Sequence, residues 1–73
     1  MDKIIKWGLI GLGNASLNLA NEFKNINNSK LVAIASKTKN KLEKFKTKFN
    51  IPNQNSYSDY DSIFKNKDID IIF

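Results

Sequence analysis

A short apolar run that ends in two closely spaced glycines constrains this chain more than any other feature. Residues 4–10 are mostly isoleucine, leucine and tryptophan, which is the length and character of a buried strand. Gly11 and Gly13 follow at once. From Asn14 onward the apolar residues recur every three or four positions, which is the period of a helix. A strand, a tight turn and a helix in direct succession predict the first unit of a parallel sheet covered on both faces.

The rest of the chain continues this alternation. We expect a second strand at residues 31–35 and a lysine-rich helix that ends before Pro52, because the residue preceding a proline avoids the helical region. A third strand is expected at 53–57, a short helix capped by Ser58 after it, and a fourth strand at 69–73. The side chains expected to be buried on the helices are Ala15, Leu19, Ala20, Phe23, Ile26, Leu42, Phe45, Phe49, Tyr60, Ile63 and Phe64.

The order β-α-β-α-β-α-β predicts an α/β fold, a parallel sheet of the Rossmann type. An apolar strand at 69–73 closes the sequence with nothing after it to cover the sheet, and an uncovered strand of this kind favours aggregation. We therefore expect residues 1–73 to be the N-terminal part of a dinucleotide-binding domain, a truncated half that folds poorly in isolation. A substrate domain is expected to lie outside this chain.

Composition excludes several classes of site. The chain has no cysteine and no histidine, which excludes a disulfide framework, a zinc site and a Ser-His-Asp or Cys-His triad. The net charge of +5 comes entirely from lysines, and without arginine it argues only weakly for a nucleic-acid partner. No apolar stretch reaches the roughly 20 residues of a membrane span, and no targeting segment is visible. We expect a cytoplasmic protein with neither nucleic-acid nor membrane partners.

The glycine loop predicts a dinucleotide site. Gly11 allows the tight turn, and Gly13 has no side chain to keep a pyrophosphate away from the backbone. Asn14 and Ala15 open the helix, whose first N–H groups and partial positive charge attract an anion. Ser16 occupies the third position of the motif, where a small residue allows the helix to pack closely on the strand. A plain tight turn is the alternative for this segment.

The end of the second expected strand bears on cofactor choice. An NAD-specific site usually places a carboxylate there to accept from the ribose 2′-hydroxyl. This chain instead has Ser36 and Lys37, with Lys41 shortly after, which favours the 2′-phosphate of NADP, although NAD remains possible. The alternative is that these lysines belong to a solvated helix face. Tyr57 is a further candidate beside the adenosine, or else a packing residue.

Several segments together resemble one family. They are Ile5-Lys6-Trp7-Gly8-Leu9-Ile10-Gly11-Leu12-Gly13-Asn14, Leu31-Val32-Ala33-Ile34-Ala35-Ser36-Lys37, Phe49-Asn50-Ile51-Pro52, Ser56-Tyr57 and Asp68-Ile69-Asp70-Ile71-Ile72. This combination resembles the start of the Rossmann domain of the Gfo/Idh/MocA oxidoreductases, named for glucose-fructose oxidoreductase, inositol dehydrogenase and a rhizopine catabolism protein. The Trp-Gly opening and the Ala-Ser-Lys ending are similar to the dihydrodiol dehydrogenase-like members.

The resemblance implies hydride transfer between NADP(H) and a sugar, cyclitol or related alcohol or carbonyl compound. A homo-oligomer is a further expectation. It implies that Ser36, Lys37 and Lys41 meet the adenosine ribose or its 2′-phosphate, with Tyr57 close to them. The Glu-Lys-Pro motif of the family, whose lysine assists proton transfer, has no counterpart here, so we expect no catalytic residue in this chain and no turnover by it alone. A non-catalytic nucleotide-binding module, either a sensor or a scaffold, is the alternative function, and a basic nucleic-acid module is the weakest.

Overall fold

The apolar run that opens the chain forms a central strand of a sheet. In a computed structural model, which describes residues 3–73, β1 (Ile5–Ile10) pairs in parallel with β2 (Ser29–Ala35) and with β4 (Ile71–Ile72). The short strand β3 (Ser56–Tyr57) pairs in parallel with β2, so the strand order is β3-β2-β1-β4. The α/β architecture with a Rossmann-type parallel sheet is therefore confirmed.

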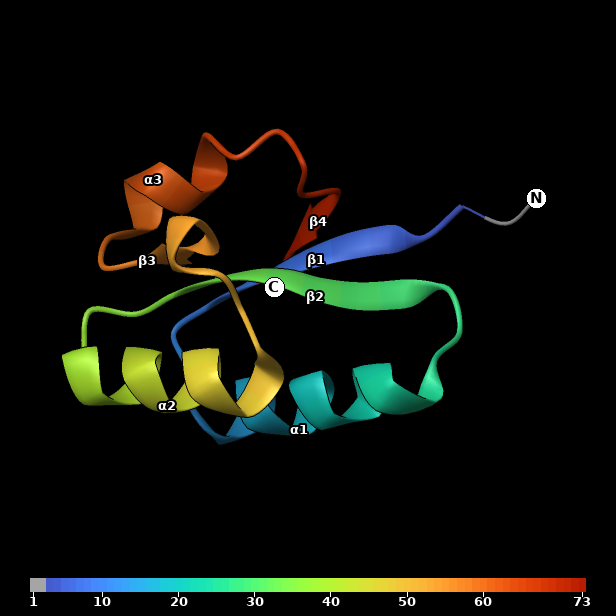
Figure 1. The fold of residues 1–73 in the computed structure, drawn as a ribbon, viewed down its shortest axis with the longest axis horizontal. Helices are drawn as coiled ribbons and strands as arrows, with labels where there is room; N and C mark the ends of the chain where they lie inside the picture. Colours follow the sequence, from blue (N-terminus) through green and yellow to red (C-terminus); the bar gives the residue numbers. More distant parts are fainter. Residues whose placement is uncertain (1–2) are drawn as a thin grey trace.

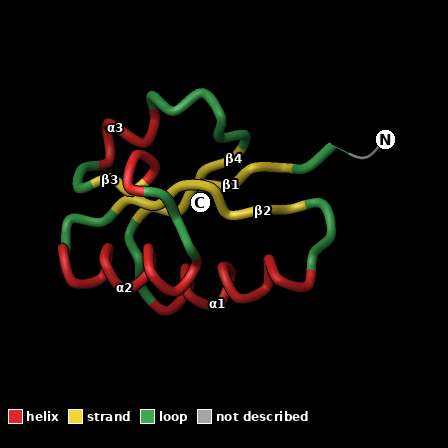
Figure 2. The backbone as a smooth tube through the Cα atoms, in the orientation of Figure 1, coloured by secondary structure: helices red, strands yellow, loops and turns green. Residues whose placement is uncertain are grey.

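Helices cover the two faces of the sheet unequally. The two long helices, α1 (Asn14–Glu22) and α2 (Lys39–Phe49), lie side by side on one face (Figure 1). The five-residue helix α3 (Tyr60–Phe64) lies on the other face, as the backbone tube also shows (Figure 2). Both long helices run opposite to the strands, so each begins at the carboxyl edge of the sheet (Figure 1).

A bulge in β2 decides which residues face which helices. The register between β1 and β2 shifts by one residue at Gly8, which leaves Val32 as the additional residue of β2. Side chains alternate strictly along a regular strand, so residues three positions apart face opposite sides. Leu31 and Ile34 nevertheless pack in the same core, beside α1 and α2, whereas Ala33 belongs to the core beside α3. The bulge permits this arrangement.

The two cores differ in the size of their side chains. The core beside α1 and α2 contains the buried residues Leu9, Leu12, Ala20, Phe23, Leu31, Ile34, Leu42, Phe45 and Ile51. The core beside α3 contains the buried residues Ala33, Ala35 and Ile63, with Ile10, Val32, Tyr57, Tyr60 and Ile69 packed against them. Trp7, the single tryptophan, packs against the first core, with its ring centroid 5.3 Å from that of Phe23 and its Nε1 donating to Ser29 Oγ at 3.3 Å.

Small residues let α3 approach the sheet. A Cβ atom added to Gly8 would lie 3.1 Å from Ile69 Cδ1 and 3.3 Å from Ile63 Cδ1, both closer than ordinary van der Waals contact. With the two alanines of β2 on the same face, β1 and β2 offer little side-chain bulk there. The short helix and the segment after it are therefore packed almost directly on the sheet.

Several expected boundaries were wrong. The brief strand expected within 53–57 is confirmed at Ser56–Tyr57, and before it Asn53–Asn55 is a 3₁₀ turn in which the Asn55 side chain donates to the Val32 carbonyl oxygen at 3.0 Å. The strand expected at 69–73 is only Ile71–Ile72 long, and the first helix ends at Glu22, where the 3₁₀ turn Phe23–Asn25 follows.

The prediction of which helix side chains are buried was wrong at three positions. Ala15 is exposed, Ile26 is 40% exposed and Phe64 is 62% exposed. On α1 the buried residues are Ala20, as expected, and Ser16. The small side chains on this face allow α1 to lie close to the sheet, which turns Ala15 outward.

Candidate functional site

Three loops meet at the carboxyl edge of the sheet. Backbone pairing continues one residue beyond the strands: the Gly11 N–H donates to the Ala35 carbonyl, and the Ser36 N–H donates to the Tyr57 carbonyl, each at 3.1 Å. The glycine loop, the loop after β2 and the end of β3 are thus joined by their backbones. The edge where parallel strands end is where ligands bind in open α/β sheets.

The two glycines of the loop have different roles. Gly11 has a φ of +70°, a conformation that L side chains rarely adopt, so the turn itself requires glycine there. Gly13 has an ordinary φ of −98°, and a Cβ atom added to it would meet nothing within 4 Å. The fold therefore does not need a glycine at position 13. The open space beside it is available to a ligand that approaches the backbone closely.

Ser16 fastens the loop to the helix. Its side chain is buried, with the residue 4% exposed, and its Oγ donates to the Gly11 carbonyl oxygen at 3.1 Å. The small residue expected at this position is present, and its hydroxyl adds a hydrogen bond that glycine or alanine could not make. The expectation of close packing between α1 and the sheet is met at this residue.

The starts of the three helices differ in their capping. Asp59 caps α3, since its carboxylate accepts from the Ser62 N–H at 2.7 Å and from the Ser62 hydroxyl at 3.0 Å, and these bonds lower its pKa below the usual value. The cap expected at Ser58 was therefore wrong by one residue. Gly13 and Thr38 begin α1 and α2 without a side-chain hydrogen bond, and neither helix has an acidic residue in its first turn.

The uncapped helix starts are suited to an anion. The first internal hydrogen bond of α1 is from Leu17 N–H to the Gly13 carbonyl at 3.0 Å, so the N–H groups of residues 14–16 have no acceptor within the helix. In α2, Lys39 and Lys41 lie in the first turn, where their charge opposes the helix dipole. A bound phosphate would satisfy the free N–H groups and offset that repulsion.

Ser36 is held inside its own loop. The residue is 4% exposed, and its Oγ accepts from the Thr38 N–H at 3.1 Å and donates to the Thr38 carbonyl at 3.3 Å. The proton of the Ser36 hydroxyl is therefore used within the loop, and one lone pair of Oγ remains as a hydrogen-bond acceptor. In this arrangement the lysines, rather than Ser36, supply donors for a phosphate.

The structure places the two candidate lysines in different directions. Lys37 is exposed, and its Nζ lies 5.1 Å from the centroid of the Tyr60 ring, on the α3 side. Lys41 is also exposed, but it lines a shallow hollow with Leu17 and Phe45, between α1 and α2. The two ammonium groups are therefore not gathered into one cluster, although both belong to the carboxyl edge.

The two tyrosines both pack against the core beside α3. The Tyr57 hydroxyl accepts from the Asn66 side chain at 3.0 Å. Tyr60, expected to be core, is half-buried, and its hydroxyl lies 3.7 Å from the position of a Cβ on Gly11. Sequence reasoning did not place Tyr60 near the glycine loop. Its position, just after the carboxyl end of a strand, was the signal that could have indicated this.

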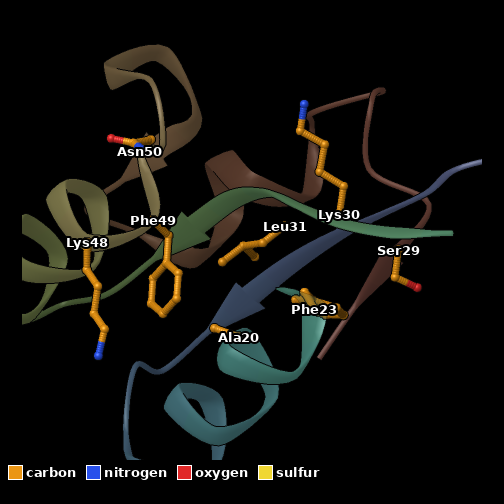
Figure 3. A pocket seen from close by; sticks show the side chains of 8 residues that line it. All are labelled: Ala20, Phe23, Ser29, Lys30, Leu31, Lys48, Phe49 and Asn50. Carbon is orange, nitrogen blue, oxygen red and sulfur yellow. The ribbon is translucent and has the colours of Figure 1, made fainter. Parts of the chain in front are cut away.

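A hollow of about 270 Å³ lies at the opposite end of the sheet, where β2 begins and the two long helices end (Figure 3). Ala20, Phe23, Leu31 and Phe49 supply its apolar lining, and Lys30 and Lys48 lie at its rim on opposite sides (Figure 3). Helix ends of this polarity present carbonyl groups rather than N–H groups. The hollow is thus separate from the glycine loop and has no helix N-terminus, so its charged donors are the side chains of Lys30 and Lys48.

The part of the chain that the structure describes shows no group of three or more acidic, histidine or cysteine side chains able to hold a metal ion. Over the same residues, no helix has the length and apolar character to cross a membrane.

Comparison with known proteins points to one family. The family model described as "Oxidoreductase family, NAD-binding Rossmann fold" matches residues 5–73. A search of curated protein sequences returned no match.

Solved structures share the fold. Scyllo-inositol dehydrogenase from Lactobacillus casei is 29% identical, with a TM-score of 0.88 over 100% of this chain. Aldose-aldose oxidoreductase from Caulobacter crescentus, complexed with glycerol, is 27% identical, with a TM-score of 0.84 over 96% of this chain. The WlbA dehydrogenase from Bordetella pertussis, in complex with NADH and UDP-GlcNAcA, is 18% identical, with a TM-score of 0.83 over 96% of this chain. The chain spans 21–22% of the length of these three proteins.

Proposed function

The chain belongs to the Gfo/Idh/MocA oxidoreductase family, whose NAD-binding Rossmann model matches residues 5–73, and from that premise we propose that its glycine loop binds the pyrophosphate of NADP(H). The observation that carries this proposal is the open space at Gly13, beside a helix start without a cap. Gly11, Gly13, Asn14, Ala15 and Ser16 would form the pyrophosphate site.

Each residue of the loop has a defined task in this proposal. Gly11 makes the turn, and Ser16 holds the Gly11 carbonyl so that the loop keeps its shape without a ligand. Asn14 and Ala15 direct backbone N–H groups toward the phosphates. A preformed loop of this kind loses little conformational entropy on binding, which favours affinity.

The adenosine end would lie along the loop after β2. Lys37 and Lys41 would attract a 2′-phosphate. Ser36 would accept a hydrogen bond from a hydroxyl of the adenosine ribose through its remaining lone pair. Tyr57 would border this region through its backbone, which bonds Ser36, rather than through its hydroxyl, which is bonded to Asn66. This balance of donors supports NADP over NAD.

The bound nicotinamide supplies the hydride chemistry, and the residues of this chain bind and orient the dinucleotide. We propose a sugar, cyclitol or related alcohol or carbonyl compound as substrate, held by a further domain of the protein, because two similar structures are inositol and aldose oxidoreductases. The Glu-Lys-Pro motif, whose lysine assists proton transfer in the family, has no counterpart in residues 1–73, so the group that moves the substrate proton would lie outside them.

Substitution at Gly13 tests the pyrophosphate site. Because a Cβ there has free space and φ is ordinary, Gly13→Ala should leave thermal stability unchanged. Gly13→Val should weaken both NAD and NADP about tenfold or more, roughly 1.4 kcal/mol, because its side chain occupies the ligand's approach path. Titration with each dinucleotide and thermal unfolding without ligand measure the two effects. Unchanged affinity in Gly13→Val would reject the proposal.

A matched variant at Gly11 separates binding from folding. Gly11→Ala places a side chain at a φ of +70° and should cost roughly 1–2 kcal/mol of folding free energy. The two glycines should therefore give opposite results, a stability loss at position 11 and a binding loss at position 13. Equal stability losses at both positions would mean that Gly13 is only a turn residue.

Cofactor choice is tested at the loop after β2. Lys37→Ala and Lys41→Ala should each weaken NADP selectively, by up to about tenfold, and reduce its salt dependence. Lys67→Ala, in the exposed loop before β4, removes the same charge and should change neither dissociation constant. Ser36→Asp keeps an acceptor for the Thr38 N–H and should shift preference toward NAD. A wild type that prefers NAD would reject the NADP proposal.

A further inference from the structure

Tyr60 connects two parts of the site that are far apart in sequence. It is the first residue of α3, and the Asp59 cap fixes the backbone at this point. One part of its ring packs against the core beside α3, and the Lys37 ammonium lies over the ring, 5.1 Å from its centroid. Its hydroxyl is directed toward the glycine loop, 3.7 Å from a Cβ position on Gly11.

The contact with the Tyr60 ring restricts the Lys37 side chain, which would otherwise sample many conformations. Lys37 is exposed, and a lysine in that state samples many rotamers, with about 2 kcal/mol of rotamer entropy. An ammonium over an aromatic face is attracted to the ring quadrupole, which favours one region of space for Nζ. Because the ring itself is held by the core, the preferred position of the charge is defined by the fold.

We propose that Tyr60 is a positioning residue for cofactor choice: its ring holds the Lys37 ammonium at the mouth of the site, where the 2′-phosphate of NADP binds. This proposal rests on the proposed function and adds a residue to it. Tyr60 acts through Lys37, so its effect is confined to the dinucleotide that carries the 2′-phosphate. The ring, rather than the hydroxyl, is the group that matters.

The experiment compares two substitutions in the intact protein, with NAD and NADP dissociation constants measured by titration. Tyr60→Leu removes the ring and should weaken NADP roughly two- to fivefold relative to NAD, the effect of an exposed cation–π contact. Tyr60→Phe keeps the ring and should leave the NADP to NAD ratio unchanged. Phenylalanine also keeps the packing against the α3 core, so it controls for folding.

A double variant identifies the path of the effect. In a Lys37→Ala background, Tyr60→Leu should cause no further selective loss of NADP, because the positioned ammonium is already absent. A selective loss that persists there, an equal loss for both dinucleotides, or tighter NADP binding by Tyr60→Leu would overturn the role of Tyr60. None of these outcomes affects the Gly13 result. If the wild type binds neither dinucleotide, the proposed function fails and this proposal fails with it.

Discussion

The two faces of the sheet differ in the number and size of the side chains that are buried on them. Beside α1 and α2, nine buried residues, most of them large, fill the space between two long helices and the strands. Beside α3, three buried residues suffice, two of them alanines, because the helix has only five residues and lies almost on the sheet. The layer of α1 and α2 is the thick layer of the molecule, and the layer of α3 is the thin one. The thick layer provides most of the buried apolar surface.

The residues that hold the glycine loop and the residues proposed to affect cofactor choice therefore lie on different faces of the sheet. The glycine loop and Ser16 belong to the thick side, where α1 is packed firmly and presents a preformed helix start. Tyr60 and Lys37, which we propose to affect cofactor choice, meet on the thin side. A thin layer with few buried contacts is expected to open more readily than a thick one. Substitutions on the two faces can test this contrast.

The largest effect is expected from truncating one buried isoleucine on each face. Ile34 and Ile63 are both 0% exposed, but Ile34 is surrounded by large side chains that cannot collapse into a cavity. Ile34→Ala should cost about 3–5 kcal/mol, and Ile63→Ala about 2–3 kcal/mol, because a short helix can shift toward the sheet. Denaturant unfolding of both variants measures the difference. Equal losses would contradict the comparison.

Adding a methyl group to the thin face should have a smaller effect. Gly8→Ala places a Cβ 3.1 Å from Ile69 Cδ1, and such overpacking costs roughly 1–3 kcal/mol. Ile69→Val removes Cδ1, so the double variant should recover part of the loss, since the contact with Ile63 Cδ1 at 3.3 Å remains. Gly13→Ala is the matched glycine substitution in open space. Failure of the valine to rescue stability would mean that the thin layer is not limited by this contact.

The smallest effect concerns acid stability at the start of α3. The Ser62 N–H and hydroxyl lower the pKa of Asp59 below its usual value, so its charged form stabilises the folded state. That contribution is complete above the unfolded pKa and is lost as the pH falls through the lower, folded pKa. Asp59→Asn keeps an acceptor for the Ser62 N–H without titrating. Its stability should therefore decline less than that of the wild type below about pH 4.

Much of the fold could be predicted from local patterns. The apolar run at the start, the turn at Gly11 and the lysine-rich helix before Pro52 each carry their signal within a few residues, and the structure confirms the order of strands and helices. The bulge at Val32 had no such signal, since it depends on pairing with β1. The 3₁₀ turn at Asn53–Asn55 also depends on a contact with a residue far away in sequence.

The candidate site was predictable in part. The glycine motif identifies its own loop, because each position has a backbone requirement that can be read locally. The Ser36 hydroxyl bonds and the Lys37 contact with Tyr60 could not be foreseen, because they depend on how two loops and a helix start meet in space. The proposed roles of Ser36, Lys37, Lys41 and Tyr57 as cofactor ligands remain predictions.

The distribution of aromatic residues gives one face of the sheet its own optical signal. Trp7 lies on the thick side against Phe23, while both tyrosines of the chain lie on the thin side. Light at the red edge of protein absorption excites indole alone, so tryptophan emission follows the layer of α1 and α2. An unlabelled sample therefore carries an intrinsic reporter for the thick side of the sheet.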